Sequence, residues 1–245
     1  MKIEINVPTS LNEITLGQYQ KYLKIAENNP DGNFLDAKMI EIFCGIPLSD
    51  SYKIKMSSVR AIVDILVSLL ESKPTHVERF EMNGVQYGFI PDLDEMSLGE
   101  YIDLDNNASQ WENMHVAMNV LYRPIKTSKL GKYNIEDYNV KNPEAMKDMP
   151  LGAAIGSLFF FLQFRNRVSE SYDTLFQQSS GDGDLSRTAN FNRKWGWYQS
   201  IYGLSNGDIT KFEDITKLNI HQCFTMLSFT KEKAEIEAQQ IKSKF

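Results

Sequence analysis

"ITLGQYQKYL" at residues 14–23 returns almost unchanged as "MSLGEYIDLD" at residues 96–105, with Leu, Gly and Tyr in the same places. In each copy a hydroxyl residue stands three positions before Gln or Glu, namely Thr15 before Gln18 and Ser97 before Glu100. This is the spacing of a capping box, in which the hydroxyl accepts from the third helical amide and the longer side chain accepts from the capping residue's own amide. Each copy is therefore predicted to begin a helix.

An apolar residue before each capping residue and a tyrosine inside each helix extend the match. Their spacing is that of a hydrophobic staple, which fixes the angle at which a chain enters a helix. The pairs are Ile14 with Tyr19 and Met96 with Tyr101. A third version at Thr210 and Glu213 places Asp214 at the staple position and is not counted as a copy. Because repeat architectures normally show at least three units, convergence on one helix-start pattern is favoured over internal duplication, which stays open.

The composition is that of a globular protein with room for a substantial core. Of the 245 residues, 42% are apolar and 24% are charged, and this length allows one domain or two. The formal net charge of −6 gives no electrostatic source for a grip on phosphate backbones, so nucleic acid is not expected as the primary partner. Two cysteines, Cys44 and Cys223, indicate a reducing compartment rather than a disulfide scaffold. The first residues lack the pattern of a secretory signal.

The longest uncharged stretch, residues 149–164, is shorter than the roughly 20 apolar residues that span a bilayer. It is predicted to be a buried core helix, and a membrane is not expected as a partner. Gly152 and Gly156 within it have the small-xxx-small spacing that lets two chain segments approach closely.

The pattern of apolar residues predicts a mainly α fold of the α+β class. Helices are expected at residues 16–28, 34–45, 58–72, a short stretch from Leu98, 111–123, 145–177, 193–205, 208–218 and 219–245. The fifth should end before Pro124, because a residue that precedes proline avoids the α region.

One small antiparallel β-hairpin is expected among the helices. Asn83-Gly84 lies between two alternating runs, and both residues of such a turn must accept positive φ. Strands are therefore predicted near 78–82 and 85–90, and the second is stopped by Pro91. Short extended pieces are also expected at residues 2–7 and 133–138.

The order of these elements predicts three parts of the chain. Residues 1–177 form a helix-rich N-terminal domain that contains the hairpin near residues 78–90. Residues 178–192 gather Ser, Gly and Asp without hydrophobic periodicity and are interpreted as a flexible loop or linker. Residues 193–245 form a C-terminal helical segment, whose Lys- and Glu-rich end is interpreted as a solvated helix.

The sequence carries no pattern of a known catalytic or metal site. His76, His115 and His221 have no His, Cys or carboxylate three or four residues further on. Phosphate-binding glycine loops and the nucleophile elbow do not occur. "SGDGD" at residues 180–184 lacks the remaining ligands of a calcium loop. No metal and no cofactor are therefore expected, and an enzyme stays open only as a third class of function.

Two groups of aromatic residues are candidates for contact with a partner. One is Trp195, Trp197, Tyr198 and Tyr202 in a short aromatic-rich stretch. The other is the run Phe159, Phe160 and Phe161 in the helix predicted at 151–176. Aromatic side chains dominate both cores and interfaces, so a core role stays open for each group.

Three segments taken together resemble a family of tailed-bacteriophage proteins. They are "VPTSLNEITLGQYQKYLKI" at residues 7–25, "FIPDLDEMSLGEYIDLD" at 89–105 followed by "WENMHVAMNVLYRPI" at 111–125, and "YNIEDY" at 133–138. The family occurs in phages of Bacteroidetes and in crAss-like phages, and its members are described as tail-assembly chaperone-like or virion-associated. The resemblance covers much of residues 7–165, with a looser match in the Trp-rich C-terminal part. It carries over no catalytic residue.

The resemblance implies a non-enzymatic protein that binds another phage polypeptide, such as a tail, portal-proximal or ejection protein, in the host cytoplasm during assembly. A structural or internal cargo protein that is retained in the virion and released with the genome stays open as the alternative. A homo-oligomer stays open as well. For the assembly role, the seven aromatic residues named above are the candidate partner contacts.

Overall fold

The computed structural model describes residues 5–29, 32–139, 142–176 and 187–243, and for residues 187–193 it describes the backbone alone. Contacts divide the chain into two compact units. Unit 1 consists of Met1–Pro91 and Asn107–Phe160, and unit 2 consists of Asp92–Asn106 and Phe161–Phe245. These boundaries differ from those predicted near residues 177 and 193. The chain passes between the units after the strand at residues 85–89, near the end of the helix at residues 98–107 and within the helix at residues 151–171.

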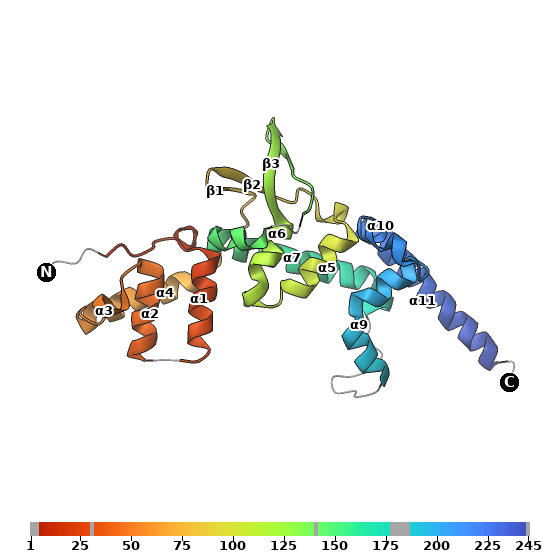
Figure 1. Ribbon diagram of the computed structural model, residues 1–245, viewed down its shortest axis with the longest axis horizontal. Coiled ribbons are helices and arrows are strands. Elements are labelled where there is room, and N and C mark those ends of the chain that lie inside the picture. Colours follow the sequence, from red (N-terminus) through yellow and green to blue (C-terminus); the bar gives the residue numbers. More distant parts are fainter. Residues whose placement is uncertain (1–4, 30–31, 140–141, 177–186, 244–245) are drawn as a thin grey trace. The chain divides into compact units, whose positions relative to one another are not determined.

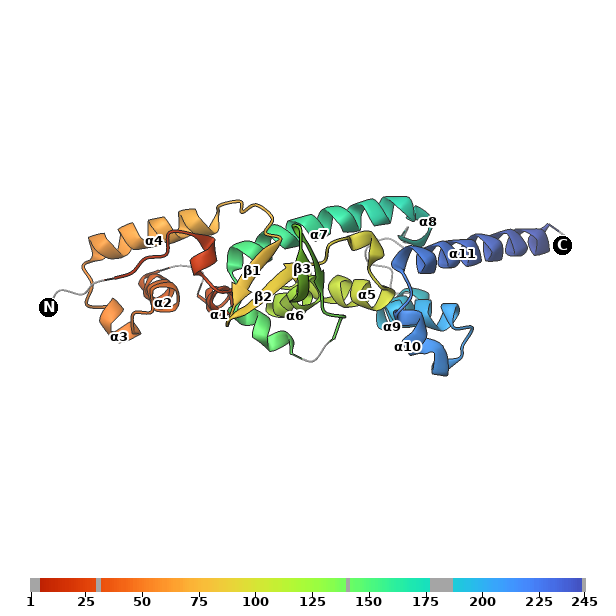
Figure 2. The same cartoon turned by 90° about the horizontal axis from the view of Figure 1, so that it is seen from above.

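Helices make up most of unit 1 (Figures 1 and 2). The α-helices are α1 (Leu16–Ala26), α2 (Asn33–Cys44), α3 (Leu48–Ser51), α4 (Met56–Leu70), α6 (Met114–Leu121) and the first part of α7 (Leu151–Ser171). Short 3-10 helices are η1 (Leu11–Glu13), η3 (Trp111–Asn113) and η4 (Pro143–Asp148). α2 packs against both α1 and α4 and buries Leu35, Ile40 and Phe43. The predicted helices at 16–28, 34–45 and 58–72 are confirmed.

A four-stranded antiparallel sheet completes unit 1, so the helix-rich α+β class is confirmed. The strands β1 (Arg79–Met82), β2 (Val85–Phe89), β3 (Tyr122–Lys129) and β4 (Lys132–Ile135) follow each other in sheet order. The predicted Asn83-Gly84 hairpin is confirmed, with φ of 51° and 76° at its two turn residues. Of the strand predicted at 2–7, residues 5–7 are not in a strand and the rest lie outside the described residues.

The β3–β4 hairpin was only partly predicted. The fifth helix ends at Leu121, before Pro124 as expected, but the chain then continues directly into β3. The extended piece expected at residues 133–138 corresponds to β4. The turn between these strands is Leu130-Gly131, with φ of 52° and 82°. Leucine is not a residue that signals such a turn, so no local pattern indicated that the two strands are joined as a hairpin.

Both repeated decapeptides begin helices with the predicted capping boxes. In the first, the Gln18 amide donates to Thr15 Oγ1 at 3.1 Å, and the Thr15 amide donates to Gln18 Oε1 at 2.8 Å. In the second, the Glu100 amide donates to Ser97 Oγ at 3.3 Å, and the Ser97 amide donates to Glu100 Oε2 at 2.8 Å. The helices that follow are α1 in unit 1 and α5 (Leu98–Asn107) in unit 2.

The first decapeptide is also joined to the start of a distant helix. The Leu16 amide donates to the Met149 carbonyl at 2.9 Å, and the Leu151 amide donates to the Ile14 carbonyl at 2.8 Å. The two bonds form an isolated antiparallel bridge, which ties the start of α1 to the start of α7 inside unit 1.

The second decapeptide makes the same bridge with a different helix. The Leu98 amide donates to the Leu218 carbonyl at 2.8 Å, and the Ile220 amide donates to the Met96 carbonyl at 3.0 Å. The start of α5 is thereby tied to the start of α11 (Ile220–Lys242) inside unit 2. Each decapeptide is therefore one half of a pair of helix starts.

The shared glycine lets the second chain segment approach each helix start. A Cβ placed on Gly17 would lie 3.0 Å from Lys147 Cβ, and one placed on Gly99 would lie 3.1 Å from the Thr216 carbonyl oxygen. In both cases the neighbour stands three positions before the bridge partner. A side chain at either position would press on the segment that leads into the second helix.

Unit 2 is built from helices alone in its described residues. Beside α5, its elements are η2 (Leu93–Glu95), the second part of α7, α8 (Asp173–Phe176), α9 (Arg187–Leu204), η5 (Ile209–Lys211), α10 (Phe212–Thr216) and α11. Thr210 lies inside η5, whose cap is Asp208, so the third decapeptide version is not a helix start. Of the linker predicted at 178–192, residues 187–192 are helical, and residues 178–186, which include "SGDGD", lie outside the described residues.

The core of unit 2 is organised around Phe224, which has no exposed surface. Its ring stacks on Trp197 at a centroid distance of 5.9 Å and meets the edges of three further rings, those of Tyr101, Tyr172 and Phe176. No helix in the described part of the chain combines the length and the apolar character that a bilayer crossing requires.

Candidate partner-binding surface

The predicted aromatic stretch lies on α9, which is broken at Gly196. The backbone there has φ of 26° and ψ of −117°, so the residues on either side do not continue one regular helix. Trp197, just after the break, lies against Phe224 and Tyr101 and donates its indole N–H to Asp105 Oδ2 at 3.1 Å. Trp197 was predicted as a partner contact, but these contacts are all with residues of unit 2.

The other aromatic side chains of α9 are exposed. Trp195, Tyr198 and Tyr202 are 39%, 47% and 56% exposed. Tyr198 lies 5.5 Å from the Trp195 ring and 5.3 Å from the Phe212 ring of α10. These three residues form what we call the α9 aromatic group, and they stay candidates for partner contact.

The phenylalanine run on α7 divides in the same way. Phe161 is fully buried beside Tyr101 and Phe164 in unit 2, so its prediction as a partner contact is corrected to a core role. Phe159 and Phe160, in unit 1, are 53% and 45% exposed. Phe160 nevertheless stacks on the His76 ring at 4.9 Å. Phe159 is the more available of the two.

α11 leaves the core of unit 2 along its length. Ile220, Cys223 and Phe224 near its start are buried, whereas every described residue from 232 to 243 is exposed. The prediction that its Lys- and Glu-rich end is a solvated helix is confirmed. Most helical stability in proteins comes from packing of an apolar face, so this end lacks the support that helices usually have.

One face of α11 carries a stripe of exposed apolar side chains that sequence reasoning missed. Met226, Phe229 and Ile236 are 54%, 59% and 55% exposed, and their spacing places them on one side of the helix. With Lys233 and Gln240 they follow the alternating three- and four-residue spacing of a coiled-coil seam, which was the signal available in the sequence. We call these five residues the α11 stripe.

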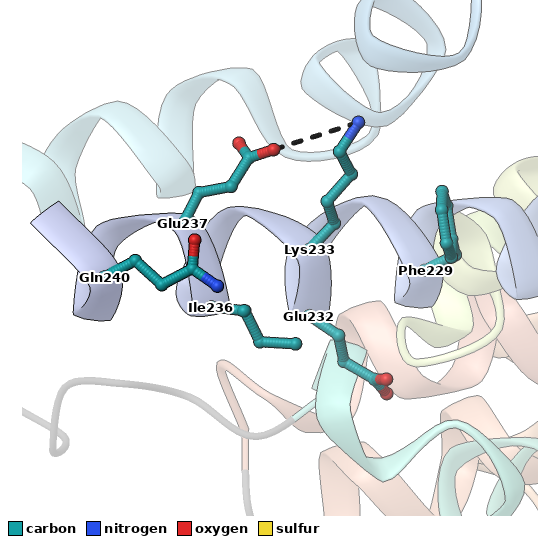
Figure 3. Close-up of a pocket in the computed structure, with 6 residues that line it drawn as sticks. All are labelled: Phe229, Glu232, Lys233, Ile236, Glu237 and Gln240. Atoms are coloured by element: carbon teal, nitrogen blue, oxygen red, sulfur yellow. Dashed lines mark ion pairs between the residues drawn. The ribbon is translucent and has the colours of Figure 1, made fainter.

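A shallow hollow of about 360 Å³ lies along this stripe (Figure 3). Figure 3 shows that its lining comes entirely from α11: Phe229, Glu232, Lys233, Ile236, Glu237 and Gln240. Lys233 and Glu237 form an ion pair of 3.9 Å at its border. An open hollow on one helix suits an extended or helical segment of another polypeptide better than a small ligand, which binds in a concave pocket that encloses most of its surface.

A series of polar groups in unit 2 joins η2, α7 and α11. His221 Nε2 lies 2.9 Å from Asp94 Oδ1, and His221 Nδ1 lies 3.0 Å from Tyr172 Oη. Asp94 also accepts from Arg167 Nη2 at 2.8 Å. The order carboxylate, imidazole, hydroxyl is that of a general-base relay. The hollows beside α11, between α1 and η3, and beside η1 include none of Asp94, His221 and Tyr172. We interpret the series as a structural network because it links η2, α7 and α11.

A second polar network surrounds His115, which is buried in unit 1. The Gln20 amide nitrogen donates to the Trp111 carbonyl at 2.6 Å and lies 3.2 Å from His115 Nδ1. In the tautomer in which Nδ1 accepts from this amide nitrogen, Nε2 carries the proton and donates it to Glu144 Oε1 at 3.1 Å. Burial lowers the pKa of His115, with a smaller contribution from the Lys147 charge. The lowered pKa favours the neutral imidazole, and the Glu144 carboxylate acts in the opposite direction.

We expect acid to weaken unit 1 through His115. In the unfolded chain a histidine takes up its proton near its ordinary pKa of about 6.5. In the folded chain the pKa of His115 is lower, so His115 is protonated only at lower pH. The free energy of unfolding should thus fall as the pH drops below about 6.5 and level off below the lowered pKa. Urea unfolding from about pH 7.5 to about pH 5 measures this slope.

The matched variant is His115→Gln, whose amide does not titrate. Its unfolding should depend less on pH over this range than that of the unchanged chain. His76, whose pKa is also lowered by burial, should account for the remaining slope. An equal slope in the unchanged chain and the variant would contradict the assignment to His115.

Metal-ligating side chains do not gather in the described residues, where no group of three or more His, Cys, Asp or Glu is placed to hold an ion. The chain matches no family model, no curated protein sequence and no solved structure.

Proposed function

We propose that this chain is a non-enzymatic bacteriophage assembly protein that binds another phage structural polypeptide, in the manner of a tail-assembly chaperone. The phage assignment rests on the resemblance of the segments at residues 7–25, 89–105, 111–125 and 133–138. The binding role rests on the α11 stripe, whose three apolar members are more than half exposed on a helix that leaves the core of unit 2.

The charge and shape of the stripe support a polypeptide partner. Its apolar members, Met226, Phe229 and Ile236, are more than half exposed, and interfaces draw most of their free energy from a few such side chains once they are buried. Glu232 and Glu237 border the hollow on α11 and would set the register of a second helix, as charges flanking a coiled-coil seam do. The α9 aromatic group adds further exposed rings in unit 2.

Recovery of partners from infected cells tests the proposal. The tagged full chain should retain a phage polypeptide from a lysate of infected cells, at low and at high salt, because apolar contacts are little screened. Recovery of the chain alone at every salt concentration would contradict the proposal. Mass spectrometry of washed virions then separates the two roles: absence fits an assembly factor, and stoichiometric presence fits the structural or cargo alternative.

The double variant Phe229→Ala/Ile236→Ala should bind the recovered partner about tenfold more weakly or worse, because it removes two central apolar contacts. Alanine keeps the helix, so folding should be retained. Ile241→Ala is the matched control, since Ile241 is 61% exposed on the same helix but lies off the stripe. Titration of each purified variant with the partner measures the difference, and equal losses in the double variant and the control would contradict the stripe as the site.

A further inference from the structure

The turn of the β3–β4 hairpin combines features that disfavour it in isolation. Leu130 has φ of 52°, a left-handed conformation that turns normally assign to Asn, Asp or Gly. Its side chain is 94% exposed. The β1–β2 hairpin in the same unit also has a two-residue turn, and there the positive φ falls on Asn83. The chain therefore uses the favourable turn residue in one hairpin and an exposed leucine in the other.

Two like charges at the same turn further destabilise it. Lys129 and Lys132 are directly paired across the two strands, and like charges in this position repel. Both are exposed, and no described residue forms an ion pair with either. Lys126, further down β3, is paired with Asp137 at 3.1 Å. We call residues 129–132 the hairpin tip.

Arg79 holds the hairpin tip in this conformation. Its guanidinium donates to the Gly131 carbonyl and to Ser128 Oγ, the second at 3.4 Å, and it lies over the Tyr133 ring at 4.4 Å. The cation brings a third positive charge beside the two lysines. Figure 1 shows β3 rising away from α6, so within unit 1 the hairpin stands clear of the helix that precedes it. The tip is thus preorganised, which lowers the conformational entropy lost on binding.

We propose that the hairpin tip is a docking element for an acidic surface of a partner polypeptide, with Leu130 entering an apolar pocket and Lys129 and Lys132 pairing with carboxylates around it. A backbone conformation that the chain holds at a free-energy cost points to a role outside the fold. Charge complementarity identifies the partner as acidic. A polypeptide is favoured over nucleic acid, because the chain has a net charge of −6 and the tip offers a leucine rather than a stacking ring.

This inference rests on the proposed function for the existence of a polypeptide partner, but it uses a different surface.

Photocrosslinking tests the inference. The full chain is made with a photoreactive benzophenone amino acid at position 130 and is irradiated in a lysate of infected cells. The same amino acid at Val85, beside the other hairpin turn and 41% exposed, is the control. The expected result is attachment from position 130 to one polypeptide, at an apolar segment flanked by Asp or Glu, as read by mass spectrometry.

Two variants sharpen the test. Lys129→Glu/Lys132→Glu should lower the attachment about tenfold, and added poly-L-glutamate should compete with it while a short DNA duplex should not. Leu130→Asn in the purified chain should raise the midpoint of thermal unfolding, because asparagine accepts the left-handed conformation more readily. An unchanged or lower midpoint would overturn the reading of the turn.

Attachment to nucleic acid, to lipid, to a second copy of this chain or to a polypeptide segment without carboxylates would overturn the proposal, as would equal attachment from position 85. If the tagged chain still recovers a phage polypeptide while position 130 attaches to nothing, the hairpin inference fails and the proposed function stands. If no polypeptide is recovered and none is attached, both fail.

Discussion

Phe224→Ala should lower the free energy of unfolding of unit 2 by about 3–5 kcal/mol, the usual result of removing a buried phenylalanine. Phe224 has no exposed surface, and its ring contacts four other aromatic rings. Alanine would leave a cavity whose walls come from α5, from Tyr172 between α7 and α8, and from α8 and α9. Urea unfolding followed by tryptophan fluorescence reports the change, because Trp197 stacks on the removed ring.

Phe229→Ala, five residues further along α11, is the matched control. Its side chain is 59% exposed, so the same substitution should change the free energy of unfolding by no more than about 0.5 kcal/mol. The two variants therefore separate a core role from a surface role on one helix. Comparable losses in both would mean that Phe229 is buried in the folded chain and would remove it from the proposed binding stripe.

Gly156→Ala should destabilise unit 1 by about 1–3 kcal/mol, even though alanine is the better helix former by about 1 kcal/mol. A Cβ at Gly156 would lie 2.6 Å from the Thr75 carbonyl oxygen and 3.2 Å from the His76 Cα. Both atoms belong to the backbone of a neighbouring segment, so the segment itself would have to move. The difference in urea midpoint from the unchanged chain measures the effect.

Gly152→Ala, one turn earlier on α7, should be tolerated. Its Cβ would lie 2.5 Å from Asn12 Oδ1, but Asn12 is exposed and the end of its side chain can rotate away. The small-xxx-small spacing of the two glycines thus has two different physical meanings in the structure. A Gly156→Ala variant as stable as the unchanged chain would contradict the close approach at Thr75.

Capping boxes and turns, which depend on a few neighbouring residues, could be predicted from the sequence. The backbone pairings between distant residues could not. Each capping box depends on two residues three positions apart. The turn at Asn83-Gly84 depends on two adjacent residues. The bridges of Ile14 and Met96 depend on helix starts at Leu151 and Ile220 that carry no shared sequence. For this reason the decapeptides were read as helix starts but not as halves of a pair.

The candidate surface shows the same limit. Phe159, Phe160 and Phe161 are adjacent and chemically identical, and only the direction of the helix decides that the third is buried. The kink at Gly196 likewise turns Trp197 inward while Trp195 stays exposed. The α11 stripe was readable from its spacing, but periodic apolar residues indicate a core face as readily as a docking face.

The paired helix starts also bear on the order in which the chain can fold during synthesis. Thr15 meets Pro150 and Ser97 meets Asn219, so the two closures overlap along the chain and neither is local. Contacts between residues so far apart are slow to form, because loop-closure entropy is lost before they contribute. The nascent chain would thus hold the first glycine-marked helix start open until the ribosome has made the start of α7, and the second until it has made the start of α11.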